Sequence, residues 1–548
     1  MPYALSNPNL IILILLAMVP SLLWLTGGGL HFVSDKRTHQ VARLSVAVAG
    51  TSFIGAIVAA MVYAVGGTTL TMTFGSVVLP GNRGDLALSL YINPVTMIML
   101  LLVSFVGFVV SRYARNYLQG EKHQKQFYVW LNLTLASILT LIVSGNMLMF
   151  VVAWMSTSFC LHHLLLFYPE RMGAVLAARK KIIVSRVGEV CLLIAVLLIG
   201  STFHSMDFDV VFQDASRMSG PFPVDLYWAS GLIVLAAALK TAQFPLQGWL
   251  IQVMEAPTPV SALLHAGIVN GGAFLILRMS PIMSKATVAS DVLAIIGLIT
   301  IVAAGLVMLT QTSVKVFLAW TTTAQMGFML LECGLGVYSL VMLHLVAHSL
   351  YKAHAFLSSG SMVDVFRAPT VRPAQSTPKF WQWVAVLIFS GVATLCIGAI
   401  FGIAPESQPA LLSFGAIIVV AMMQLLLQSL KAGVGMAFIA RAGGVSALVC
   451  AGYFSLHGVF HWMLATTLPV LPVTNSPAQF VLSGLVILAF FIILLIQQNL
   501  PNLTQYGFAR RAYVHLYNGL YVDIPFSRLV QRCWSIKPVR CVPPPKGV

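Results

Sequence analysis

Long apolar stretches follow one another along almost the whole chain, separated by short polar segments. A helix needs about 20 mainly apolar residues to cross a bilayer, and roughly fifteen stretches reach this length. They lie near residues 9–25, 41–64, 91–110, 127–145, 147–168, 182–203, 226–243, 258–278, 288–309, 314–334, 337–359, 381–403, 411–430, 443–470 and 477–497. This pattern predicts an all-α polytopic membrane protein. We expect the first stretch to be retained, because it lacks the basic flank and cleavage site of a signal peptide.

The composition agrees with this pattern and excludes a soluble globular protein. Of the 548 residues, 59% are hydrophobic and 8% are charged, and the mean hydropathy is +0.91. The net charge of +16 comes mainly from lysines and arginines in alternate predicted loops and in the tail. Because basic residues concentrate in cytoplasmic loops, the charge predicts a cytoplasmic C-terminus and an outer N-terminus, and it does not indicate nucleic-acid binding.

Two predicted helices contain residues that break helices. The first interruption follows Lys240 and contains Pro245, Gly248, Pro257 and Pro259. The second lies within 391–409 and contains Gly391, Gly398, Gly402, Pro405 and Pro409. Broken helices are tolerated where they line a polar cavity, and a pair in corresponding halves indicates inverted repeats. We expect repeats at 127–278 and 288–430, between N-terminal helices (1–126) and a C-terminal part (431–548).

The predicted span near 337–359 carries titratable residues along one side. His344, His348 and Lys352 are spaced i, i+4 and i+8, so they lie along one stripe, whereas His354 points away from it. Ionisable groups inside a membrane mark ion pathways by default, and histidines relay protons near neutral pH. The stripe therefore predicts a proton relay. Metal binding lacks an evident third ligand, and structural packing is the other alternative.

Lys240 is a second lysine predicted to lie within the membrane. Desolvation favours the neutral form of a buried amine, so such a lysine accepts and releases a proton as neighbouring charges move. The alternative is a lysine that extends its amine to the membrane surface. His265 follows the helix interruption, and we expect it to link Lys240 to the centre of the protein.

Four charged residues near the ends of spans complete the predicted pathway. Glu189 would modulate Lys240, and the alternative is a helix pair with Arg186, three residues earlier. Glu255 and Lys315 lie where an ion could reach the spans from the cytoplasm. Their alternatives are an ordinary loop carboxylate and a positive-inside anchor.

The chain has no CxxC pair, GxGxxG segment or Walker loop. We therefore expect no metal or cofactor in this chain and no catalytic site, with energy supplied by an ion gradient or by a partner. The tail segment 511–517 is basic and aromatic. It predicts a membrane-surface helix or a docking strip, and a cytoplasmic tail without a partner is the alternative.

Five segments carry a family resemblance in chain order: 240–250, 257–266, 311–315, 325–328 and 344–361. They resemble motifs of the antiporter-like membrane subunits of respiratory complex I, its photosynthetic relative and the Mrp cation/proton antiporters. The resemblance implies two inverted five-helix repeats with broken helices. It also implies that Lys240 is the central lysine of the first half, that His265 is the central relay residue, and that His344, His348 and Lys352 form the relay of the second half.

Arg186 and Glu189 match the family's Arg-Val-Gly-acid block, and two other positions depart from the family pattern. The family has a glutamate where this chain has Met155, and it has a lysine that is absent near Glu406. In its length, in Met155 and in the tail segment 515–523, the chain resembles the DabB branch. This branch comprises the membrane subunits of DabA–DabB inorganic-carbon accumulation systems. This resemblance implies a bacterial inner membrane and a cytoplasmic DabA-like partner that resembles a zinc β-carbonic anhydrase and holds the zinc.

The sequence thus predicts a non-enzymatic subunit that conducts protons, or sodium, and couples this flow to the uptake of CO2 or bicarbonate by the partner. One alternative is a proton-pumping subunit of an NADH- or ferredoxin-quinone oxidoreductase. The others are an Mrp-type antiporter subunit and a passive scaffold.

Overall fold

The computed structural model describes residues 8–34, 37–78, 85–218, 220–360, 378–402, 409–432, 435–469, 477–503 and 505–534. The first part of the chain forms α1 (Pro8–His31), α2 (Thr38–Gly66), β1 (Leu70–Val78), β2 (Asp85–Ile92), α3 (Pro94–Tyr117), α4 (Gln124–Val143), α5 (Met147–Leu165), α6 (Met172–Phe203), α7 (Phe208–Arg217) and α8 (Val224–Lys240). The middle part forms α9 (Gly248–Gln252), η2 (Val253–Glu255), α10 (Thr258–Leu263), η3 (Leu264–Ile268), α11 (Gly271–Arg278), α12 (Ser280–Met283), α13 (Thr287–Met308), α14 (Val314–Gly334) and α15 (Tyr338–Leu357). The last part forms α17 (Phe380–Ile400), α18 (Pro409–Lys431), α19 (Met436–Leu464), α20 (Pro477–Leu503), α21 (Gly507–Tyr517), η4 (Gly519–Tyr521) and α22 (Asp523–Cys533).

These helices confirm the predicted membrane architecture. Among the described residues, 14 helices are long and apolar enough to cross a bilayer, with α10, η3 and α11 taken together as Thr258–Arg278. The remaining predicted span, near 226–243, corresponds to α8, which has 17 residues. The chain is therefore a multi-pass membrane protein with a predominantly helical fold.

An antiparallel hairpin of β1 and β2 is an addition to the predicted helices. Residues 70–74 alternate apolar side chains with threonine, which is the period of a strand. The segment is short and lies between two much longer apolar stretches, so the helical pattern around it obscured this signal. The hairpin ends where α3 begins, and Asn93 caps α3 by accepting from the Thr96 amide at 2.7 Å.

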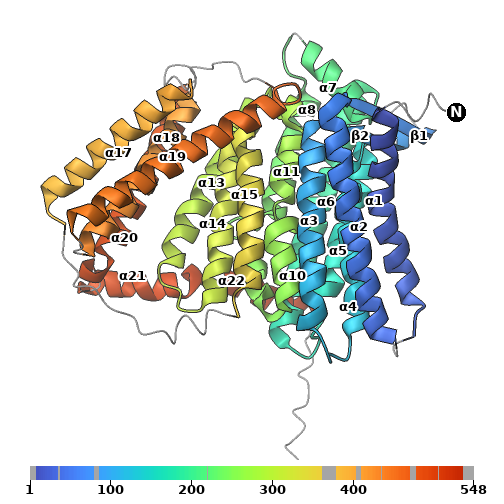
Figure 1. The fold of residues 1–548 in the computed structure, drawn as a ribbon, viewed down its shortest axis with the longest axis horizontal. Coiled ribbons are helices and arrows are strands. Elements are labelled where there is room, and N and C mark those ends of the chain that lie inside the picture. Colours follow the sequence, from blue (N-terminus) through green and yellow to red (C-terminus); the bar gives the residue numbers. More distant parts are fainter. Residues whose placement is uncertain are drawn as a thin grey trace, which may run out of the picture.

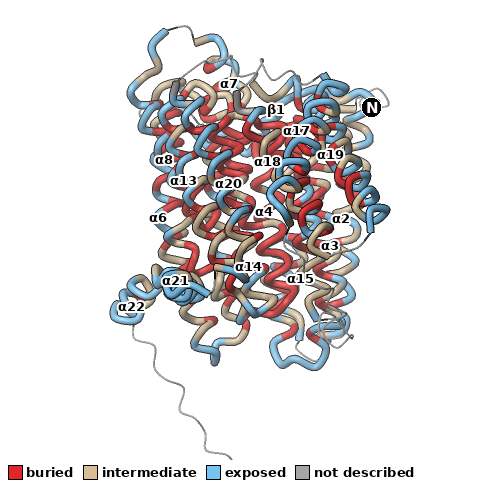
Figure 2. The backbone as a smooth tube through the Cα atoms, turned by 90° about the vertical axis from the view of Figure 1, so that its left-hand side faces the viewer, coloured by how far each residue is buried: buried red, intermediate tan, exposed pale blue. Residues whose placement is uncertain are grey.

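The hairpin and the two tail helices, α21 and α22, lie at opposite ends of the bundle. Figure 1 shows β1, β2 and α7 at one end, here called the hairpin side, and α21 and α22 lying across the other end, here called the tail side. The helices from α1 to α15 form a thick body, and α17 to α20 lean against it. Figure 2 shows that buried residues run through the middle of the bundle, whereas α21 and α22 are mostly exposed.

The first predicted interruption is present, and the second differs from the prediction. α8 ends at Lys240, and the turn that follows contains Ala242 with a φ of 51°. α17 is continuous through Gly391 and Gly398 up to Ile400. A glycine costs a helix only about 1 kcal/mol relative to alanine, so the surrounding apolar residues maintain the helix. Residues 403–408, with Pro405 and Glu406, lie outside the described part of the chain.

The tail helices connect distant parts of the bundle on the tail side. Lys180 of α6 has a fully buried side chain and donates to both carboxylate oxygens of Asp523 in α22, at 2.8 and 2.6 Å. Gln252 donates to the same carboxylate at 3.0 Å. The backbone carbonyl of Tyr517 in α21 accepts from Gln311, between α13 and α14, at 3.2 Å. The tail therefore contacts both segments that were predicted as repeats.

Candidate functional site

Two buried lysines meet at one serine between α5, α6 and α8. Lys240, the last residue of α8, donates to the hydroxyl oxygen of Ser158 at 3.3 Å. Lys181 of α6 donates to the backbone carbonyl of the same serine at 2.6 Å. Ser158 is 1% exposed and Lys181 is 3% exposed, so these contacts lie in the protein interior. Lys181 was not among the predicted site residues, because its place in a basic cluster near the start of a span concealed its burial.

Glu189 is the carboxylate that faces these lysines. Its side chain is 2% exposed and pairs with Arg186, one turn earlier, at 3.0 Å. Glu189 also lies within electrostatic range of Lys181 and Lys240. The local helix pair with Arg186 and the electrostatic interaction with Lys240 therefore occur together. Met155, at the position of the family's glutamate, packs against the hydrophobic core, so Glu189 supplies the negative charge near Lys240.

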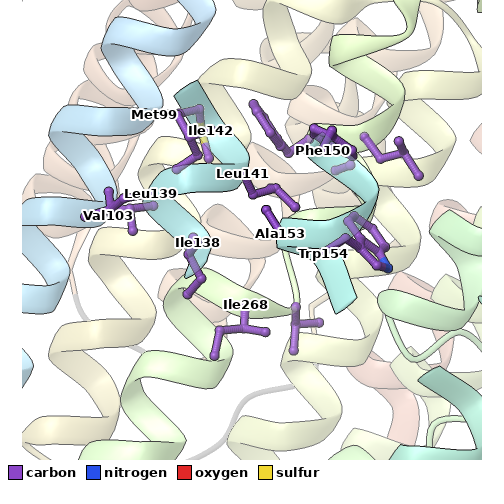
Figure 3. Packing of buried hydrophobic residues seen from close by; sticks show 14 of the residues in the cluster. Met99, Val103, Ile138, Leu139, Leu141, Ile142, Phe150, Ala153, Trp154 and Ile268 are labelled. Atoms are coloured by element: carbon purple, nitrogen blue, oxygen red, sulfur yellow. The ribbon is translucent and has the colours of Figure 1, made fainter. Parts of the chain in front are cut away.

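A small cavity adjoins the amine of Lys240. It has a volume of about 20 Å³, and Trp154 and Gly271 line it together with Lys240. The Lys240 amine lies 4.3 Å from the centre of the Trp154 ring. Figure 3 shows Trp154 with Phe150 and Ile268 in the packed apolar cluster of this region. A cavity of this size holds about one water molecule, so a water can reach the lysine inside an otherwise apolar wall.

The helix that follows the interruption holds His265. Residues Leu264–Ile268 form one π-helical turn, a local widening that is frequent at functional sites. His265 is fully buried and stacks on the ring of Phe356, with the ring centres 4.4 Å apart. It lies within electrostatic range of Lys352 and His348. The structure thus places His265 with the second group of titratable residues.

Asn270 provides a polar contact between the lysines at Ser158 and the titratable residues of α15. Its side-chain amide donates to the hydroxyl oxygen of Ser349 in α15 at 2.8 Å. The next residue, Gly271, lies against the stem of Lys240, because a Cβ atom at Gly271 would be 3.6 Å from the Lys240 Cε atom. Asn270 therefore lies between Lys240 and α15. Asn270 was not among the predicted site residues, since asparagine carries no charge.

Lys352 and His348 are buried in the centre of α15. The Lys352 amine donates to Oγ1 of Thr321 at 2.5 Å and to the Leu318 carbonyl at 3.2 Å. His348 is 5% exposed. Neither ring nitrogen of His348 or of His265 has a protein partner among the described residues. Buried polar groups of this kind are normally satisfied by ordered water, so the two histidines indicate a hydrated interior.

His344 completes the stripe and contacts a buried carboxylate. Its Nδ1 atom lies 3.0 Å from Oε2 of Glu332, and its Nε2 atom lies 2.6 Å from Oε1 of Gln325. The rings of His344 and His348 are 6.1 Å apart. Glu332 is 1% exposed and was not predicted, although a single glutamate inside an apolar span is itself a signal for a functional site.

The other predicted residues lie nearer to the solvent. Glu255 is half exposed and faces Arg171, which donates to its backbone carbonyl at 3.2 Å and lies 3.7 Å from its carboxylate. Lys315 lies partly exposed in the first turn of α14. The Arg186 side chain is 46% exposed. Of these, Arg186 alone contacts the buried groups, through Glu189. The described part of the chain contains no cluster of three or more His, Cys, Asp or Glu side chains suited to a metal.

Comparisons with known proteins identify the family. Residues 144–408 match the model described as NADH:quinone oxidoreductase/Mrp antiporter, and residues 80–128 match the N-terminus of complex I chain 5. The chain is 42% identical over 469 residues to the probable inorganic carbon transporter subunit DabB2 of Halothiobacillus neapolitanus, covering 85% of this chain and 84% of that protein. It is 45% identical over 315 residues to the probable subunit DabB of Hydrogenovibrio crunogenus, covering 57% and 59%.

A solved structure agrees with the fold. The Mrp complex from Dietzia sp. DQ12-45-1b matches with a TM-score of 0.55 and 20% identity, covering 96% of this chain and 57% of that chain. At this identity the match concerns the fold alone. Together with the sequence matches, it shows that the chain belongs to the family of antiporter-like membrane subunits found in NADH:quinone oxidoreductases and Mrp antiporters, and that it is similar to the DabB proteins.

Proposed function

We propose that this chain conducts protons, with sodium as the alternative ion, down a transmembrane gradient and couples the flow to the uptake of inorganic carbon. The observation that carries the proposal is a row of buried titratable residues across the bundle. In the first predicted repeat, 127–278, the row contains the buried Lys181, Glu189 and His265 and the partly buried Lys240. In the second, 288–430, it contains the buried Glu332, His348 and Lys352 and the partly buried His344. Burying so many ionisable groups in a membrane is costly, and such groups by default mark an ion pathway.

The two lysines at Ser158 provide a place where charge can move. Two positive charges close together in a medium of low dielectric repel each other strongly, so a proton on Lys181 disfavours a proton on Lys240. Glu189 and Arg186 set the balance between them. In the proposed pathway, a proton passes from the histidines and Lys352 through the region of Asn270 to these amines and leaves on the tail side.

The proposed partner is a cytoplasmic DabA-like subunit that resembles a zinc β-carbonic anhydrase. The relatives named DabB are described as inorganic carbon transporter subunits, which supports a multi-subunit complex. In this proposal, zinc and the hydration of CO2 belong to the partner, and the chain itself is an energy-coupling subunit of the bacterial inner membrane. The basic tail, with α21 and α22, lies on the cytoplasmic side.

A protonophore should stop inorganic-carbon uptake in cells that carry this chain and its partner, because the flow through the chain then has no driving force. Uptake of radiolabelled bicarbonate would measure this effect, and a sodium ionophore would distinguish the two ions. Uptake that continues after both gradients have collapsed would exclude gradient coupling. Copurification of a zinc-containing neighbour supports the proposed partner, whereas copurification with quinone oxidoreductase subunits would support the oxidoreductase alternative.

Replacing Glu189 by glutamine should slow ion flux by about tenfold or more. Two unit charges a few ångströms apart interact by about 2–4 kcal/mol at an effective dielectric of 20, and each 1.4 kcal/mol corresponds to about tenfold in rate. The variant removes the negative charge that lies near the two lysines. Flux into proteoliposomes, followed with a trapped pH dye, would measure the change. Glu170→Gln, at an exposed carboxylate outside the proposed pathway, is the matched control, and equal fluxes in the two variants would contradict the role of Glu189.

A further inference from the structure

α19 carries a second stripe of titratable residues, which is separate from the residues of the proposed pathway. Tyr453, His457 and His461 are spaced i, i+4 and i+8, so they lie along one side of the helix. The stripe on α15 has the same spacing. α19 lies outside both segments that match the family models, 80–128 and 144–408, so those matches assign it no role.

His457 connects α19 to the first turn of α15. Its Nε2 atom lies 3.2 Å from the hydroxyl oxygen of Ser339, and the residue is 9% exposed. The ring of His461, one turn later, lies 6.1 Å from the ring of His457 and is nearly parallel to it, at 28°. His461 is exposed. The stripe therefore leads from the interior to the surface near the C-terminal end of α19, which reaches the hairpin side (Figure 1).

Tyr453 connects the same stripe to the buried carboxylate of α14. It is partly buried, packs against the apolar cluster that contains Phe414, and lies within electrostatic range of Glu332. Glu332 in turn contacts Nδ1 of His344 at 3.0 Å. Tyr453 therefore lies near the titratable groups of α14 and α15.

A cavity lies on the hairpin side, next to the residue that precedes Ser339. Its volume is about 550 Å³, and Tyr338, the neighbour of Ser339, lines it together with Lys285, Asp291 and Gln479. Since this volume is many times that of one water molecule and its wall includes polar side chains, the cavity has room for ordered water. α17, in contrast, contains no Asp, Glu, His, Lys or Arg between Phe380 and Ile400, so this helix offers no carboxylate, imidazole or basic group for the same task.

We propose that Tyr453, His457 and His461 form the hairpin-side end of the ion pathway and carry protons from the outer solution to Glu332. This inference rests on the proposed function. One ring nitrogen of His457 accepts a proton from the side of His461 and water. The other ring nitrogen releases a proton toward the Tyr453 hydroxyl, which passes its own proton to Glu332. An imidazole suits this task because its two nitrogens exchange the roles of donor and acceptor near neutral pH.

Proton flux in proteoliposomes that contain the chain with its copurified partner tests the proposal. A potassium diffusion potential drives the flux, and a trapped pH dye reports it. His457→Gln should reduce the flux by about tenfold or more, because glutamine keeps a hydrogen bond to Ser339 but cannot relay a proton. His163→Gln is the matched control. His163 stacks on Trp130, with the ring centres 3.9 Å apart, and its variant should retain wild-type flux.

Chemical rescue separates proton relay from a structural role. Imidazole added to His457→Ala proteoliposomes should restore part of the flux. The proposal is overturned if His457→Gln conducts like the wild type while Lys352→Met does not. It is also overturned if His457→Ala loses thermal stability and imidazole has no effect. A wild-type complex that carries no proton or sodium flux would contradict the proposed function itself. This result differs from a failure of the α19 relay, in which the wild-type complex still conducts.

Discussion

Ion flux through the Lys352→Met variant should fall by about a hundredfold, the lower range for the loss of a proton-transferring group. Lys352 is 1% exposed and lies between the histidines of α15 and the hydroxyl of Thr321. Methionine has a similar length and fills the same space, but it neither carries nor transfers a proton. The pathway would therefore be interrupted at its centre while the packing of α14 against α15 is preserved.

Proton flux into proteoliposomes and bicarbonate-dependent growth at ambient CO2 would measure this change, with protein level checked in the same membranes. Lys431→Met is the matched control. The Lys431 amine also donates to a backbone carbonyl, that of Gln498, at 2.5 Å, but Lys431 lies at the end of α18. Wild-type growth and flux in Lys352→Met would remove Lys352 from the pathway.

The Asp523→Ala variant should loosen the tail from the bundle and lower the stability of the protein. Removing one partner of a buried ion pair costs about 3–5 kcal/mol, because the other charge is left without compensation. The Lys180 side chain is fully buried, whereas the Asp523 side chain is 30% exposed, so the expected loss is nearer to about 2 kcal/mol. The midpoint of thermal unfolding in detergent should fall by about 2 °C, and trypsin should cleave the tail more rapidly.

Two variants control for this effect. Lys180→Met combined with Asp523→Leu removes both charges, and stability should recover, since an apolar pair often replaces a buried ion pair without loss. Glu255→Ala removes a pair whose side chains are 51–53% exposed, and it should change stability by less than about 0.5 kcal/mol. Equal losses in Asp523→Ala and Glu255→Ala would show that Lys180 and Asp523 contribute no more than a surface pair.

The titratable residues of the candidate site could be recognised from the sequence only where their pattern lay within a single helix. The spacing of His344, His348 and Lys352 follows from helical periodicity alone, and the proline and glycine residues after Lys240 locate the interruption. Glu332 shows the same kind of signal and was overlooked. Lys181 looked like one more basic residue near a span end, and only the packing of α6 against α5 shows that its amine is buried at Ser158.

The sequence by itself determined the membrane-spanning helical architecture, the first helix break and the stripe on α15, because hydrophobicity and helical period are properties of consecutive residues. Only the tertiary structure decided which groups meet across helices. Lys181 and Lys240 share Ser158, His344 contacts Glu332, and His457 contacts Ser339. The physical reason is that these contacts join residues up to 118 positions apart, so they depend on how helices pack and not on any local pattern.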